Sequence, residues 1–377
     1  RGANLLALHP EWAWVAAASP MPIFFAAAGW ANATTSAAAA APRIRTLVGV
    51  ATTVVVAWTV GVLVASAIAG DPGVVADGAR VATQPAWFLA AYVPLDAIGA
   101  TLGRIARTRP IALTVGSSLL ALGLLDLARF GFNAPQWTAW PGFFLAWVVP
   151  WLLGAWWRDR YANGFAEQRV GALLALGGGL VGFALVHWFG YVAQLIDAIP
   201  GKRSNTTPPT LYTAVAAVAQ VGVLLILAPY LDRIGRRWRR LWDRAGEAAV
   251  GVYLWHLSAL ALCGGVIALG LPLPERLTAA WWLTRPVWWA AVIAVALVFV
   301  LATDAVRRRL RTTQQSTAPS VQAIALGVAL TTAGAALVGL RGPRTVPLAL
   351  ACSALFVGAW FALRGRSQSR RPTKASS

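Results

Sequence analysis

The sequence predicts an all-α protein, a polytopic transmembrane helical bundle of about eleven spanning helices. Of its 377 residues, 58% are hydrophobic and only 12% are charged, whereas about 25% are charged in an ordinary soluble domain. Apolar runs of about 18 to 24 residues recur along nearly the whole chain, and each is long enough to cross a bilayer. These runs mostly lack the polar face that a helix of a soluble bundle needs. The composition therefore favours a membrane protein over a soluble bundle.

The expected spans follow one another along the chain. Pro94 interrupts the third and the fifth is short, so these two depart most from a regular crossing. In order, the spans are expected at residues 13–33, 46–69, 84–103, 110–128, 142–157, 170–189, 211–230, 248–270, 286–303, 321–340 and 346–363.

Arginine marks alternate connections between these spans, and none of the 32 Lys and Arg residues falls inside one. The positive-inside rule places arginine-rich connections in the cytoplasm. An odd number of spans then puts Arg1 outside and the C-terminus in the cytoplasm. We expect an integral, multi-pass protein of the plasma membrane. The arginine-rich connections contain Arg43 and Arg45, Arg104 to Arg109, Arg158 to Arg169, Arg233 to Arg244, Arg307 to Arg311, and the C-terminal tail.

The formal net charge of +19 could suggest a nucleic-acid partner. Only Lys202 and Lys374 are lysines, and the arginines lie where membrane-orientation signals belong, so we expect membrane lipids as partners and no nucleic acid. Cys263 and Cys352 fall within spans and are interpreted as apolar fillers. No cluster of metal-ligating residues is evident, so no metal is expected.

His256 lies inside an apolar run that extends from about residue 246 to residue 269. An imidazole in hydrocarbon loses its water partners, so it needs a partner or a function there. Asp96 also lies deep in a span, about 10 Å above its inner end, while His256 lies about 12 Å above its own. If the two helices touch, Asp96 would hold one imidazole nitrogen and leave the other as a base. We predict that His256 and Asp96 are catalytic; the alternative is that His256 only hydrogen-bonds between helices.

The segment from Leu231 to Glu247 places apolar residues at helical spacing among arginines, which predicts an amphipathic helix on the inner membrane surface. Its arginines would bind the phosphates of a cytosolic coenzyme through bidentate contacts. Anchoring to anionic lipid is the alternative. The predicted cofactor-binding residues are Arg236, Arg237, Arg239 and Arg240.

Two motifs resemble those of the acyltransferase 3 family of integral membrane acyltransferases. Pro22-Ile23-Phe24-Phe25 followed by Gly29-Trp30 is similar to the family's P-x-F-F-x-x-S-G-[FY] signature. The stretch from Ala249 to His256 is similar to its S-x-x-x-Y-L-x-H signature. The resemblance covers about residues 1–310. It implies two appended transmembrane helices in 311–363, while the basic, Ser-rich composition of 364–377 predicts a disordered cytoplasmic tail.

The chain departs from the family pattern at two motif positions and at its start. Ala28 and Ala249 stand where the family has serines. The first expected span matches the family's second helix, so the family's first helix, with its arginine and its histidine base, is expected to be missing from an N-terminally truncated chain.

The resemblance implies an acyltransferase that moves an acyl group, typically acetyl, from cytosolic acyl-CoA as co-substrate to a hydroxyl of a cell-envelope glycan or glycolipid. A histidine base would deprotonate the acceptor hydroxyl beside the thioester carbonyl. The alternative is a proton-coupled transporter or flippase of a lipid-linked or acyl substrate, with Asp96 and His256 as a proton relay. A membrane scaffold without catalysis is a third interpretation.

Overall fold

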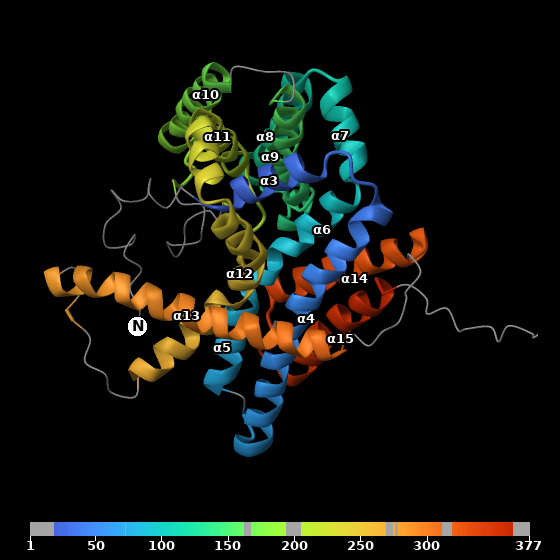
Figure 1. Ribbon diagram of the computed structural model, residues 1–377. Coiled ribbons are helices and arrows are strands. Elements are labelled where there is room, and N and C mark those ends of the chain that lie inside the picture. The colour runs from blue at the N-terminus through green and yellow to red at the C-terminus, as the bar shows by residue number, and fades with distance from the viewer. Residues whose placement is uncertain are drawn as a thin grey trace, which may run out of the picture. The chain divides into compact units, whose positions relative to one another are not determined.

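The computed structural model describes residues 19–71, 73–161, 167–193, 205–268, 274–275, 278–310 and 319–364. Within these ranges the ordered elements are helices, and no β-strand forms (Figure 1). Eight of the helices are long and apolar enough to cross a membrane, and a bent pair would make a ninth crossing. The all-α, multi-pass membrane fold is therefore confirmed, while the total of eleven crossings stays a prediction. The expected disordered tail from residue 365 onward lies outside the described residues.

The helices divide into two compact units that interleave along the chain. The first takes residues up to Ser36 and Ile98–Arg237, and the second takes Ala37–Ala97 and the residues from Trp238 onward. The first unit contains α3 (Met21–Asn32), α7 (Gly99–Thr108), α8 (Ile111–Gly131), the short 3₁₀ helix η3 (Gln136–Ala139), α9 (Gly142–Tyr161), α10 (Glu167–Trp188) and α11 (Leu211–Arg237). The second contains α4 (Ala37–Ala69), α5 (Gly73–Thr83), the 3₁₀ helix η2 (Gln84–Phe88), α6 (Leu89–Ala97), α12 (Arg239–Ala268), α13 (Ala279–Leu310), α14 (Val321–Leu340) and α15 (Val346–Ala362).

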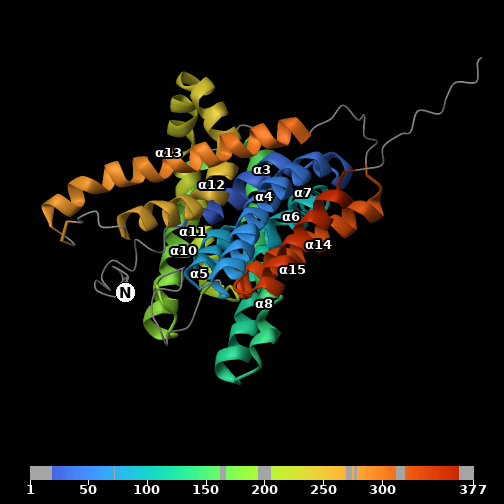
Figure 2. The ribbon, with the colours of Figure 1, turned by 90° about the horizontal axis from the view of Figure 1, so that it is seen from below.

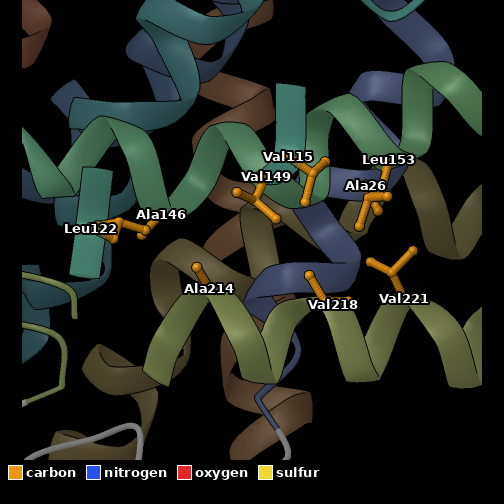
Figure 3. Packing of buried hydrophobic residues seen from close by; sticks show 9 residues of the cluster. All are labelled: Ala26, Val115, Leu122, Ala146, Val149, Leu153, Ala214, Val218 and Val221. Atoms are coloured by element: carbon orange, nitrogen blue, oxygen red, sulfur yellow. The ribbon is translucent and has the colours of Figure 1, made fainter. Parts of the chain in front are cut away.

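Small and β-branched residues form the core of the first unit, where α3, α8, α9 and α11 meet (Figure 3). Small side chains let helix backbones approach closely, which strengthens dispersion contacts in a membrane protein. α3 and α9 approach closely: a Cβ added to Gly29 would lie 1.9 Å from the Trp151 carbonyl oxygen, and one added to Gly154 would lie 1.9 Å from the Ala26 oxygen. The buried cluster consists of Ala26, Val115, Leu122, Ala146, Val149, Leu153, Ala214, Val218 and Val221.

In the second unit, α14 and α15 form a hairpin that lies along α4 and α6 (Figures 1 and 2). α14 ends in a left-handed cap, because Gly342 has a φ of 65° and its N–H, like that of Arg341, donates to the Leu337 carbonyl. Hydroxyl groups join α15 to α4: Thr59 donates to the Ala349 carbonyl at 3.0 Å, and Ser353 donates to Thr59 at 2.9 Å. The two helices after residue 310 are thus packed into the second unit.

Two of the differences between the expected spans and the helices bear on Arg43 and Asp96. α4 begins at Ala37 rather than near residue 46, because the alanines of 37–41 are strong helix formers. Arg43, expected in a connection, therefore lies within a helix. The expected third span is broken: one helical stretch ends at Ala97, and α7 begins at Gly99 after Ile98.

The predicted amphipathic helix over 231–247 is also wrong in its boundaries. α11 continues through Arg237, a turn follows at Trp238, and α12 begins at Arg239. The residues after Pro229 include good helix formers such as leucine and arginine and no second proline, so each neighbouring transmembrane helix extends into the arginine-rich segment.

Candidate functional site

His256 lies on α12 and is half-buried. Its Nδ1 lies 2.5 Å from the Tyr253 carbonyl oxygen of the same helix. A carbonyl oxygen can only accept, so Nδ1 is the donor in this contact, and a neutral ring then has its lone pair on Nε2. No residue in the described part of the chain hydrogen-bonds Nε2. In its neutral form the ring can therefore accept a proton at Nε2.

Tyr253, which supplies that carbonyl, is packed against two other rings. The His256 ring centroid lies 5.4 Å from that of Tyr253. The Phe88 ring of η2 meets the Tyr253 ring edge-on at 5.1 Å, a favourable geometry for aromatic pairs, and Phe88 is buried. Phe88 thus packs against the turn of α12 that precedes His256.

Two tryptophan side chains fix the same stretch of α12. The Trp58 indole of α4 donates to the Ser258 hydroxyl at 2.9 Å, and the Trp255 indole of α12 donates to the Thr303 hydroxyl of α13 at 3.1 Å. Ser258 and Trp255 are buried, so each bond satisfies polar groups away from solvent. η2, α4 and α13 all constrain the region around His256.

Asp96 is fully buried on α6, and its partner is Arg43 rather than His256. Arg43 donates from Nη2 to Oδ1 at 2.9 Å and from Nε to Oδ2 at 3.2 Å. This bidentate contact neutralises a carboxylate that is costly to bury alone. The considered contact between Asp96 and His256 is not formed, because Arg43 is inside α4 and occupies the carboxylate. A catalytic role of Asp96 stays a prediction.

A signal for this pair was present in the sequence. A buried carboxylate at the depth of Asp96 requires a cation, and Arg43 directly precedes an apolar run on the same expected side of the membrane. Because every arginine was expected in a connection between spans, Arg43 was not considered as the partner of Asp96.

The four predicted coenzyme-binding arginines lie at the ends of two helices, and all are exposed. Arg236 on α11 pairs with Asp232, and Arg239 on α12 lies 3.8 Å from Asp243. Exposed pairs of this kind are weak, so a phosphate could displace the carboxylates. Arg237 and Arg240 complete the set, whose role in binding stays a prediction.

Two other titratable groups have local structural partners. Asp126 on α8 accepts from the Tyr191 hydroxyl at 2.8 Å and from the Leu211 N–H at 2.7 Å, and so caps the start of α11. The His187 Nδ1 lies 3.1 Å from the Phe183 carbonyl of its own helix, and the residue is exposed. Among the residues that the structure describes, no group of three His, Cys, Asp or Glu could hold a metal ion.

A family model described as an acyltransferase domain matches residues 8–305. The match covers most of the chain and includes every predicted site residue. It ends within α13, so α14 and α15 lie beyond it. Comparisons with curated proteins and with solved structures found no match.

Proposed function

The chain belongs to the acyltransferase 3 family and is a membrane acyltransferase, and we propose that it moves an acetyl group from cytosolic acetyl-CoA to a hydroxyl of a cell-envelope glycan or glycolipid. The observation that carries the chemistry is the state of His256. Its Nδ1 donates to the Tyr253 carbonyl, which leaves the Nε2 lone pair for a substrate proton.

The reaction needs one base and no redox step. His256 Nε2 takes the proton of the acceptor hydroxyl while that oxygen attacks the thioester carbonyl. The tetrahedral intermediate collapses by breaking the C–S bond, and the imidazolium returns the proton to the leaving thiolate. The products are an acetyl ester and free coenzyme A.

The donor would enter from the side that carries the exposed arginines, because coenzyme A is rich in phosphates and cytosolic. Arg236 and Arg237 on α11, and Arg239 and Arg240 on α12, offer guanidinium groups that suit phosphate oxygens. The proposal includes a cytoplasmic location for the arginine-rich segment and the C-terminus, as the positive-inside rule favours, and the plasma membrane as the location of the protein. Attaching an impermeant label to single cysteines introduced in 231–246 tests that orientation: labelling from outside intact cells would reject it.

The ion pair of Asp96 weighs against the transporter alternative. The Asp96 carboxylate is held at two points by Arg43, so it would have to break this ion pair in order to carry a proton. A proton relay also requires proton transfer between Asp96 and His256, and no hydrogen bond joins them in the described residues.

The decisive experiment supplies acetyl-CoA labelled in the acetyl carbon to membranes that contain the protein. We expect label in an alkali-labile ester on an envelope glycan or glycolipid, and none with His256→Ala. A second sample receives acetyl-CoA labelled in the adenine, so that movement of the intact donor can be followed. Movement of intact substrate across the membrane without ester formation would contradict acyl transfer.

A further inference from the structure

We propose that the α14–α15 hairpin is a positioning element of acyl transfer, although it lies beyond the residues that match the family. The hairpin fixes α4 and η2, and these two elements hold α12 on either side of His256. All four participants belong to the second unit. The inference rests on the proposed role of His256 as the base.

The first connection runs from α15 through α4. Thr59 is buried and uses its hydroxyl twice, donating to the Ala349 carbonyl and accepting from Ser353, both on α15. Its chain neighbour Trp58 donates to Ser258 of α12. Two successive residues of α4 thus join α15 to a point of α12 just after His256.

The second connection runs from α14 through η2. A Cβ added to Gly339 would lie 3.2 Å from the Trp87 Cβ, so α14 is packed directly on η2. The next residue, Phe88, contacts the Tyr253 ring edge-on. Tyr253 supplies the carbonyl that accepts from the His256 Nδ1. This connection therefore reaches α12 just before His256.

The two connections together fix the rotation and the register of α12 at the base. A helix residue is displaced by about 100° of rotation or 1.5 Å of rise when the helix shifts by one position. A misplacement of the catalytic group by about 1 Å can lower the rate about a hundredfold. The two connections on either side of His256 are therefore expected to affect turnover rather than substrate binding.

The test compares Thr59→Val with Thr53→Val on the same helix. The Thr53 hydroxyl donates only to the Gly49 carbonyl of α4, so this control removes a similar group without touching α15. Activity is measured per folded protein in detergent, with kcat and KM for acetyl-CoA determined separately. We expect Thr59→Val to lower kcat by about tenfold with little change in KM, Thr59→Ser to restore it, and Thr53→Val to match the wild type.

A second variant keeps the proposal testable if Thr59→Val fails to accumulate. Phe88→Leu removes the edge contact with Tyr253 and leaves the hairpin bonds intact; we expect the same fall in kcat and a displaced pH profile of kcat, because the His256 environment changes. Wild-type kcat per folded protein in both variants would overturn the positioning role while leaving the acyltransferase proposal in place. A wild-type protein that forms no acetyl ester would overturn both.

Discussion

The Arg43 guanidinium of α4 holds the Asp96 carboxylate of α6 at two points, with Nη2 at 2.9 Å from Oδ1 and Nε at 3.2 Å from Oδ2. The carboxylate side chain is 1% exposed and the arginine side chain 38% exposed, so the pair joins a buried acid to a cation that reaches the surface. Such a pair positions two helices of one unit and is sensitive to the loss of either partner.

Removing one partner is expected to cost more than removing both. Asp96→Ala leaves the guanidinium without its partner and Arg43→Ala leaves a buried charge, and each should destabilise the protein by on the order of 3 kcal/mol. Arg43→Lys cannot make the two-point contact and should fall between these variants and the wild type. Thermal unfolding in detergent measures the effect, with Arg45→Lys as the control.

The double variant Arg43→Gln/Asp96→Asn tests the reasoning behind that prediction. It removes both charges and retains hydrogen-bonding groups, so it should be more stable than either Ala variant. A double variant as unstable as the sum of the single ones would show that the two residues act independently.

His256→Ala is expected to lower acyl transfer by at least tenfold, because the base that accepts the hydroxyl proton is lost. The measurement is ester formation from labelled acetyl-CoA, normalised to folded protein. His187→Ala is the control, since His187 is exposed and its ring lies against the Phe183 carbonyl and ring of its own helix. Near-normal turnover of His256→Ala would assign the ring to packing.

The exposed arginines make a prediction that separates coenzyme binding from lipid anchoring. Replacing Arg236, Arg237, Arg239 and Arg240 with Gln should raise KM for acetyl-CoA about tenfold or more while kcat changes little, because charge-assisted contacts to phosphate are lost. The matched control is Arg104→Gln/Arg107→Gln on α7, where both arginines are also exposed. An unchanged KM, with weaker retention in membranes that contain anionic lipid, would favour anchoring.

The fold class follows from the sequence because hydrophobic length is a local property that each apolar run carries by itself. The hydrogen-bond partners of Asp96 and His256 do not follow from the sequence in this way, because they depend on the three-dimensional structure. Arg43 joins Asp96 only once the alanine-rich start of α4 is helical, and the His256 Nδ1 bonds a carbonyl that every helix possesses.

The last prediction compares the same substitution, Gly→Ala, at three glycines of the first unit that differ in how closely a facing helix approaches. A Cβ at Gly29 or at Gly154 would lie 1.9 Å from a backbone oxygen of the facing helix, α9 or α3. Neither backbone can move aside without separating the two helices, so Gly29→Ala and Gly154→Ala should each destabilise the protein by about 3 kcal/mol or more. At Gly177 on α10 no atom lies within 4 Å of the added Cβ, and alanine is the better helix former. Gly177→Ala should therefore be neutral or stabilising by up to about 1 kcal/mol. Unfolding of the three purified variants in detergent decides the point. Equal stability of Gly29→Ala and Gly177→Ala would mean that α3 and α9 are not in contact as described, and the placement of the Pro22–Trp30 motif would have to be revised.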